Sequence, residues 1–176
     1  MFTTILVSLC RYVPAAIAIA AAVSKASQPN KTAASMAGLF KLTSTQGSLI
    51  GWMIIAAEAT TGSLLLFVPS ALFVSIIAAS FFVGMGGMVL ILVAGGKSGA
   101  SCGCFGSKGR LSVRLALHDL GLGLMALAPG LSTDRSSPVA LMIGALGIGL
   151  AFLPGVARMM SARVQSRAEF VLGASK

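Results

Sequence analysis

Residues 71–94 read ALFVSIIAASFFVGMGGMVLILVA and contain no charged side chain. A transmembrane α-helix needs about 20 consecutive apolar residues, and this stretch is longer than that. Because the hydrocarbon of a bilayer offers no hydrogen-bond partner to backbone amides, a single segment that crosses it must be helical. The stretch therefore predicts a membrane-spanning helix and places the chain among integral membrane proteins.

The composition of the whole chain supports the same class. Of its 176 residues, 56% are hydrophobic and only 10% are charged, whereas soluble domains carry about 25% charged residues. A soluble protein of this length could not bury so much apolar surface in one core. The composition thus excludes a soluble globular domain and predicts a multi-pass protein of the cell membrane.

The apolar stretches predict an all-α integral membrane helical bundle with four core spans and a fifth, C-terminal span. We assign residues 1–131 to a four-helix membrane domain, 132–157 to the additional transmembrane helix and 158–176 to a basic tail. The first span could instead be a cleaved signal peptide, which would leave four spans. The predicted spans are Thr4–Ser24, Ser48–Val68, Ala71–Ala94, Leu115–Leu131 and Val139–Ala157.

Basic residues are distributed unevenly over the two faces of this predicted bundle. With five spans, every lysine and arginine except Arg11 and Arg135 falls on the face opposite the N-terminus. The positive-inside rule makes that crowded face cytoplasmic. Basic loops beside anionic lipid account for the net charge of +9, so we expect membrane lipid and no nucleic acid as a partner.

Two cysteines, Cys102 and Cys104, lie one residue apart in the short polar gap before the fourth predicted span. A bridge between them would close a very small ring, which the intervening Gly103 makes possible. Strained bridges of this kind are oxidising and labile, which suits exchange better than permanent cross-linking. Lys97, Lys108 and Arg110 would favour the thiolate form. We therefore predict Cys102 and Cys104 as a reactive thiol pair.

The third cysteine, Cys10, lies near the opposite membrane face and is expected to be a small packing residue. Faces about 30 Å apart keep it from reaching the thiol pair. A structural zinc site needs four ligands, and the chain has one histidine and no second cysteine pair. No self-contained metal site is expected.

Glu58 lies in the middle of the second predicted span, where an ionised carboxylate costs several kcal/mol unless it is paired. Two interpretations stay open. Glu58 contacts a quinone ring or relays protons, or it forms a buried ion pair with Arg11 or Lys25 of the first span. His118, early in the fourth span, could act as the base that deprotonates a thiol, or it could simply lie at the headgroup level.

Four features in order connect the chain with a known family. Arg11 and Lys25 mark the first span, Glu58 is followed by Gly62, and a polar loop opens with Gly95-Gly96-Lys97. Cys102-Gly103-Cys104-Phe105-Gly106 then precedes the fourth span. Over about residues 5–130 the chain resembles the methylamine utilisation protein MauE family, within the DoxX-like small membrane bundles. The resemblance implies maturation of a disulfide-rich amine dehydrogenase subunit, or a related thiol oxidation outside the cytoplasm.

These observations favour a membrane protein that performs thiol–disulfide exchange as a quinone-linked oxidoreductase. Cys102 and Cys104 would react with a client protein that contains disulfides, assisted by Glu58 and His118. A membrane quinone or a thioredoxin-like protein would exchange electrons with the pair. A non-catalytic assembly or export factor, or a small-molecule carrier that uses Glu58, are the alternatives. The positive-inside rule places the two cysteines on the cytoplasmic side of the membrane. Oxidative maturation of disulfides takes place outside the cytoplasm, so the two expectations conflict.

Overall fold

The computed structural model describes residues 2–68, 72–100, 110–131 and 146–147. Throughout this part of the chain the regular elements are helical, as the sequence predicts. Helix α2 lies between α1 and α3 in the chain, and α4 continues into the π-helical turn η1. The elements are α1 (Phe2–Ala26), α2 (Pro29–Phe40), α3 (Ser44–Phe67), α4 (Leu72–Leu92), η1 (Val93–Lys97) and α5 (Val113–Leu131).

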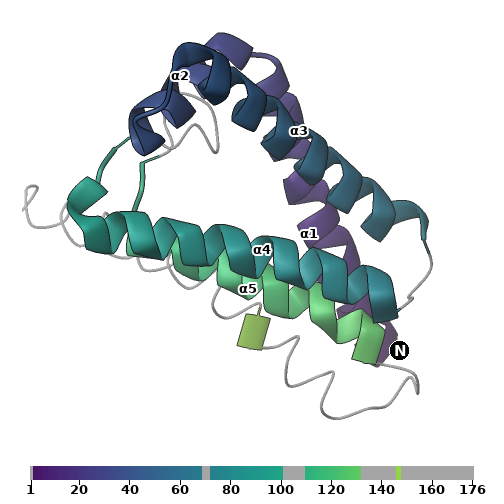
Figure 1. The fold of residues 1–176 in the computed structure, drawn as a ribbon. Coiled ribbons are helices and arrows are strands. Elements are labelled where there is room, and N and C mark those ends of the chain that lie inside the picture. The colour runs from purple at the N-terminus through teal and green to yellow at the C-terminus, as the bar shows by residue number, and fades with distance from the viewer. Residues whose placement is uncertain (1, 69–71, 101–109, 132–145, 148–176) are drawn as a thin grey trace, which may run out of the picture.

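The four longest helices pack as two pairs, α4 with α5 and α1 with α3. Helices α4 and α5 run side by side along most of their length, and α1 packs against both α3 and α5 (Figure 1). The short helix α2 covers the start of α3. The end of α1, α2, the start of α3, η1 and the start of α5 lie at one end of the molecule, which we call the α2 end. The N-terminus lies at the opposite end.

Three helices are long and apolar enough to cross a membrane, which confirms the first three predicted spans as such helices: Ile5–Ala26, Ser44–Phe67 and Leu72–Lys97. Large apolar side chains on these helices point outward, and Phe67, Phe73 and Ile91 are each more than 70% exposed. In water such exposure would be costly, whereas lipid solvates these side chains.

The fourth predicted span is present as α5, which begins two residues earlier than expected. It is not among the helices that meet the length and composition of a membrane span, because Arg114, His118 and Asp119 make its first two turns polar. It nevertheless packs along α4 over most of its length. The fifth predicted span and the basic tail lie almost entirely outside the described residues.

The segment between the first two spans was predicted as a loop, and that prediction is wrong. It contains helix α2, which starts with Pro29 in its first turn, where a missing N–H costs nothing. Helix α2 ends at Lys41, whose φ of 54° is left-handed. Thr43 then forms a capping box with Gln46, which starts α3 four residues earlier than predicted.

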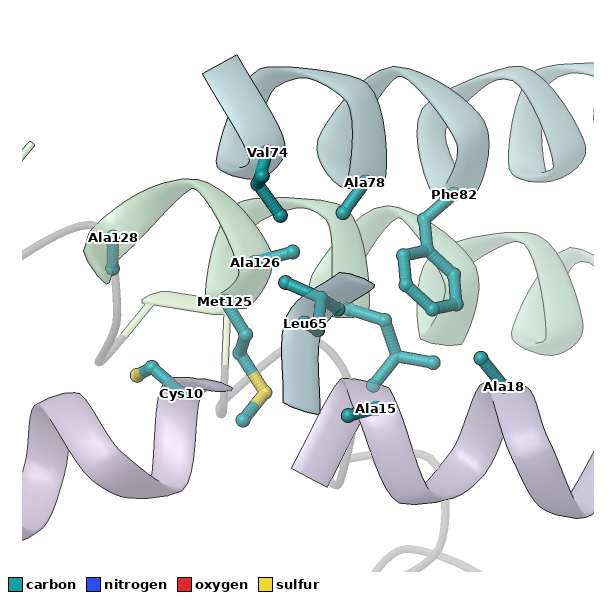
Figure 2. Packing of buried hydrophobic residues seen from close by; sticks show 11 residues of the cluster. Cys10, Ala15, Ala18, Leu65, Val74, Ala78, Phe82, Met125, Ala126 and Ala128 are labelled. Carbon is teal, nitrogen blue, oxygen red and sulfur yellow. The ribbon is translucent and has the colours of Figure 1, made fainter. Parts of the chain in front are cut away.

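The core lies where α1, α3, α4 and α5 meet (Figure 2). Small residues such as Ala15 and Ala78 let the helices approach, and Phe82 and Met125 fill the space between them. Cys10 belongs to this core and is 1% exposed. It is a free thiol, so its predicted role as a packing residue agrees with its position.

Candidate functional site

Glu58 forms a buried ion pair at the contact between α1 and α3. The Lys25 ammonium, in the last turn of α1, donates a hydrogen bond to Glu58 Oε1. The two residues are only 1% and 5% exposed. Of the two partners that the sequence allowed for Glu58, the structure selects Lys25, which neutralises the carboxylate inside the bundle.

A glycine one helical turn after Glu58 makes this pairing possible. Gly62 faces α1 so closely that a methyl group there would lie 3.0 Å from the Ala15 carbonyl oxygen and 2.7 Å from Ile19 Cγ1. Small residues permit this kind of close backbone approach between membrane helices. The tight contact at Gly62 brings the end of α1 within reach of Glu58.

Arg11, the other candidate partner, binds the C-terminal end of α3 instead. Its Nε donates to the Leu65 carbonyl at 2.6 Å, and its Nη2 donates to the carbonyls of Leu66 at 3.1 Å and Val68 at 2.8 Å. The last carbonyls of a helix lack partners within the helix and carry partial negative charge. Arg11 therefore stabilises the end of α3 and takes no part in the Glu58 site.

The second oxygen of Glu58, Oε2, is buried and has no hydrogen-bond partner among the described residues. Glu58 lines a cavity of about 30 Å³ together with Asp119 of α5. Such a volume holds about one water molecule. The other lining residues are apolar: Ile17, Ala18, Ala21, Phe81, Phe82, Met85 and Leu122.

His118 precedes Asp119 in α5 and does not itself line the cavity. Its Nδ1 is 3.6 Å from Asp119 Oδ1, and the two side chains are 26% and 14% exposed. That separation is too long for a hydrogen bond, and Nδ1 is buried without a partner among the residues described. Sequence reasoning singled out His118 and passed over Asp119 as a site residue. The available signal was an aspartate within an apolar helix, but its position opposite Glu58 depends on how α5 packs.

The residues on either side of the predicted thiol pair are held together at the α2 end. The Gly99 N–H donates to the Leu111 carbonyl at 2.9 Å, and the Leu111 N–H donates to the Ala100 carbonyl at 2.8 Å. Leu111 is 1% exposed and packs in a second apolar cluster with Met36 and Val89. Cys102 and Cys104 themselves lie outside the described residues, but the segment that contains them is anchored at both ends.

Lys97, predicted to favour the thiolate, donates from its ammonium to the Leu39 carbonyl in the last turn of α2. It lines an open groove of about 580 Å³ between α2 and the residues after α4. Ala100, two residues before Cys102 in the sequence, also lines this groove. The remaining lining residues are small or apolar: Ala34, Ser35, Gly38, Leu39, Gly96 and Ser98.

The model of a family described as methylamine utilisation protein MauE matches residues 3–132. No curated protein and no solved structure matches the chain. The matched region contains helices α2 to α5 and nearly all of α1. It also contains Glu58, His118 and the predicted thiol pair, and it ends before the predicted fifth span.

Proposed function

Since the chain belongs to the methylamine utilisation protein MauE family, we propose that it is a multi-pass cell-membrane protein that performs thiol–disulfide exchange in support of methylamine utilisation. Its client would be a disulfide-containing partner such as an amine dehydrogenase subunit. Cys102 and Cys104 would be the reacting residues.

The observation that carries this proposal is the way in which the chain is held on both sides of the two cysteines. We call the part between Ala100 and Leu111, which contains Cys102 and Cys104, the thiol segment. Backbone hydrogen bonds join Gly99 and Ala100 to Leu111, and Leu111 is buried beneath α2. The thiol segment therefore starts and ends at a rigid point of the bundle, beyond the long apolar part of α4. The open groove at Ala100 offers room for a partner segment beside this point.

The exchange would transfer two electrons and two protons. A thiolate of the client attacks the Cys102–Cys104 bridge and forms a mixed disulfide, which releases the other cysteine as a thiolate. A second client thiolate then displaces the bound cysteine, so that the client becomes a disulfide and the pair a dithiol. A membrane quinone or the disulfide of a thioredoxin-like partner would reoxidise the pair. His118 would accept a thiol proton if the thiol segment folds toward α5.

Replacing Cys102 and Cys104 by Ser tests the proposal. We expect the double variant to insert normally and to leave the client with free thiols. A single Cys104→Ser change removes the bridge but leaves the Cys102 thiol. Its thiolate should attack a disulfide of the oxidised client, release one client thiolate and remain in a mixed disulfide, because no Cys104 thiol is present to displace it. Mass spectrometry detects this mixed disulfide. The matched control is Cys10→Ser, since Cys10 is buried in the core among apolar residues and should not react.

One outcome would overturn the exchange activity. If the double variant is present at normal levels and the client still acquires its disulfides, the cysteines are not required. The protein would then act as a non-catalytic assembly or export factor. The third hypothesis, a small-molecule carrier, finds little support because Glu58 is paired with Lys25 and its cavity is small.

A further inference from the structure

We propose that Glu58 and Asp119 form an internal proton-binding site, in which their carboxyl groups share one proton through a water molecule held between them. The site is separate from the thiol pair and does not depend on the proposed exchange activity. Its ligands are a proton and a water molecule, and its residues come from α3 and α5.

The geometry leaves one oxygen of Glu58 available for this role. Lys25 occupies Oε1, while Oε2 is buried and unpartnered in the described structure. The cavity that Glu58 lines is also lined by Asp119, which approaches from α5. Helix α4 lines the cavity with three apolar side chains: Phe81, Phe82 and Met85. Glu58 and Asp119 are thus the two polar residues that line this cavity.

The cavity that both residues line has room for a water molecule. A buried polar atom without a partner costs about 1–3 kcal/mol, and this cost falls when a water bridges it to a second group. A water needs roughly 10–15 Å³ and at least two polar partners. The cavity of about 30 Å³ meets the first requirement, and the carboxyl groups of Glu58 and Asp119 meet the second.

The charges around the cavity balance when one of the two carboxyl groups keeps a proton. Lys25 of α1 supplies one positive charge against two carboxylates, and Glu58 and Asp119 interact electrostatically. Arg11 is bound to the end of α3, and Arg114 is exposed one turn before His118. Two carboxylates that share a buried site do not both ionise readily, so retaining one proton balances the charge of Lys25 with a single carboxylate.

His118 borders the proposed site through Asp119. Its Nδ1 lies 3.6 Å from Asp119 Oδ1, and its side chain is about one-quarter exposed.

Infrared spectroscopy of the full chain in lipid nanodiscs tests the proposal, because the protein has only four Asp and Glu side chains. At about pH 7 we expect the carbonyl band of one protonated carboxylic acid, which shifts in D2O. Glu58→Gln and Asp119→Asn should each abolish the band, since the remaining carboxylate then balances Lys25. The controls Asp134→Asn and Glu169→Gln should leave it unchanged.

Several results would overturn the proposal. The wild type could lack the band at neutral pH, which would place the balancing proton on His118 or leave both carboxylates ionised. The band could also persist in Asp119→Asn, which would make Glu58 an isolated acid.

Circular dichroism establishes that each variant is folded, and Asp119→Asn remains informative if Glu58→Gln does not assemble, because Asp119 makes no ion pair with Lys25. The Cys102→Ser/Cys104→Ser variant should keep the band, which separates this test from that of the exchange activity.

Discussion

Lys25 and Glu58 carry opposite charges at a depth where neither has access to bulk water. Lys25 is among the most buried large side chains of the described structure, at 1% exposure. Each charge is tolerated because the other is in direct contact. Removal of one partner leaves an uncompensated buried charge, whereas removal of both leaves none.

This predicts a characteristic pattern of stability at the residue scale. Lys25→Met should lower the free energy of unfolding by about 3–5 kcal/mol, and the double variant Lys25→Met/Glu58→Gln should recover part of that loss. Thermal unfolding in detergent or lipid measures both. A Lys25→Met protein as stable as the wild type would contradict the ion pair.

Arg11 allows a second prediction at the same scale. Arg11→Gln should lower stability by about 1.5–3 kcal/mol, because charged hydrogen bonds to the carbonyls at the end of α3 are lost. Arg11→Lys keeps the charge but not the forked geometry and should recover only part of the loss. The infrared band expected from Glu58 and Asp119 should persist in both variants; its disappearance would mean that Arg11 acts on that site.

At the scale of elements, the contact between α1 and α3 depends on Gly62. A β-carbon there would approach the Ala15 carbonyl to 3.0 Å, and a branched side chain would separate the two helices. Gly62→Val should therefore destabilise the protein by about 1–3 kcal/mol and lengthen the Lys25–Glu58 contact. The matched control is Gly84→Ala in α4, since nothing lies within 4 Å of the added methyl group. Equal stability of the two variants, measured by thermal unfolding, would argue against the close contact.

At the scale of the whole molecule, charge is concentrated at one end. Apart from Arg11, every basic residue in the described ranges lies at the α2 end: Lys25, Lys31, Lys41, Lys97, Arg110 and Arg114. From the positive-inside rule we expect this end to face the cytoplasm. The thiol segment is anchored at the same end, so orientation decides which compartment its cysteines meet.

Thiol labelling of intact cells measures that orientation. A membrane-impermeant reagent should leave Cys102 and Cys104 unmodified in whole cells and modify them once the membrane is permeabilised. Cys10 is buried and should stay unmodified in both conditions, so Cys10→Ser serves as the background control. Labelling of the pair in intact cells would reverse the orientation and would place the exchange outside the cytoplasm.

Hydropathy was sufficient to predict α1, α3 and α4, because the length of apolar chain that a bilayer requires is a local property of the sequence. It missed α2, whose mixed composition carries no such signal and whose buried residues Thr32, Met36 and Leu39 are defined by neighbouring helices. Sequence reasoning also established that Glu58 needs a compensating partner, since the cost of a carboxylate in lipid does not depend on the fold.

The choice of that partner belongs to the tertiary structure. Arg11 and Lys25 both lie on α1, and only the rotation and offset of α1 against α3, set by the contact at Gly62, bring Lys25 to Glu58 and Arg11 to the end of α3. Asp119 reaches the same cavity because α5 packs beside α1 and α4. These are relations between helices distant in the sequence, and no local pattern of residues encodes them.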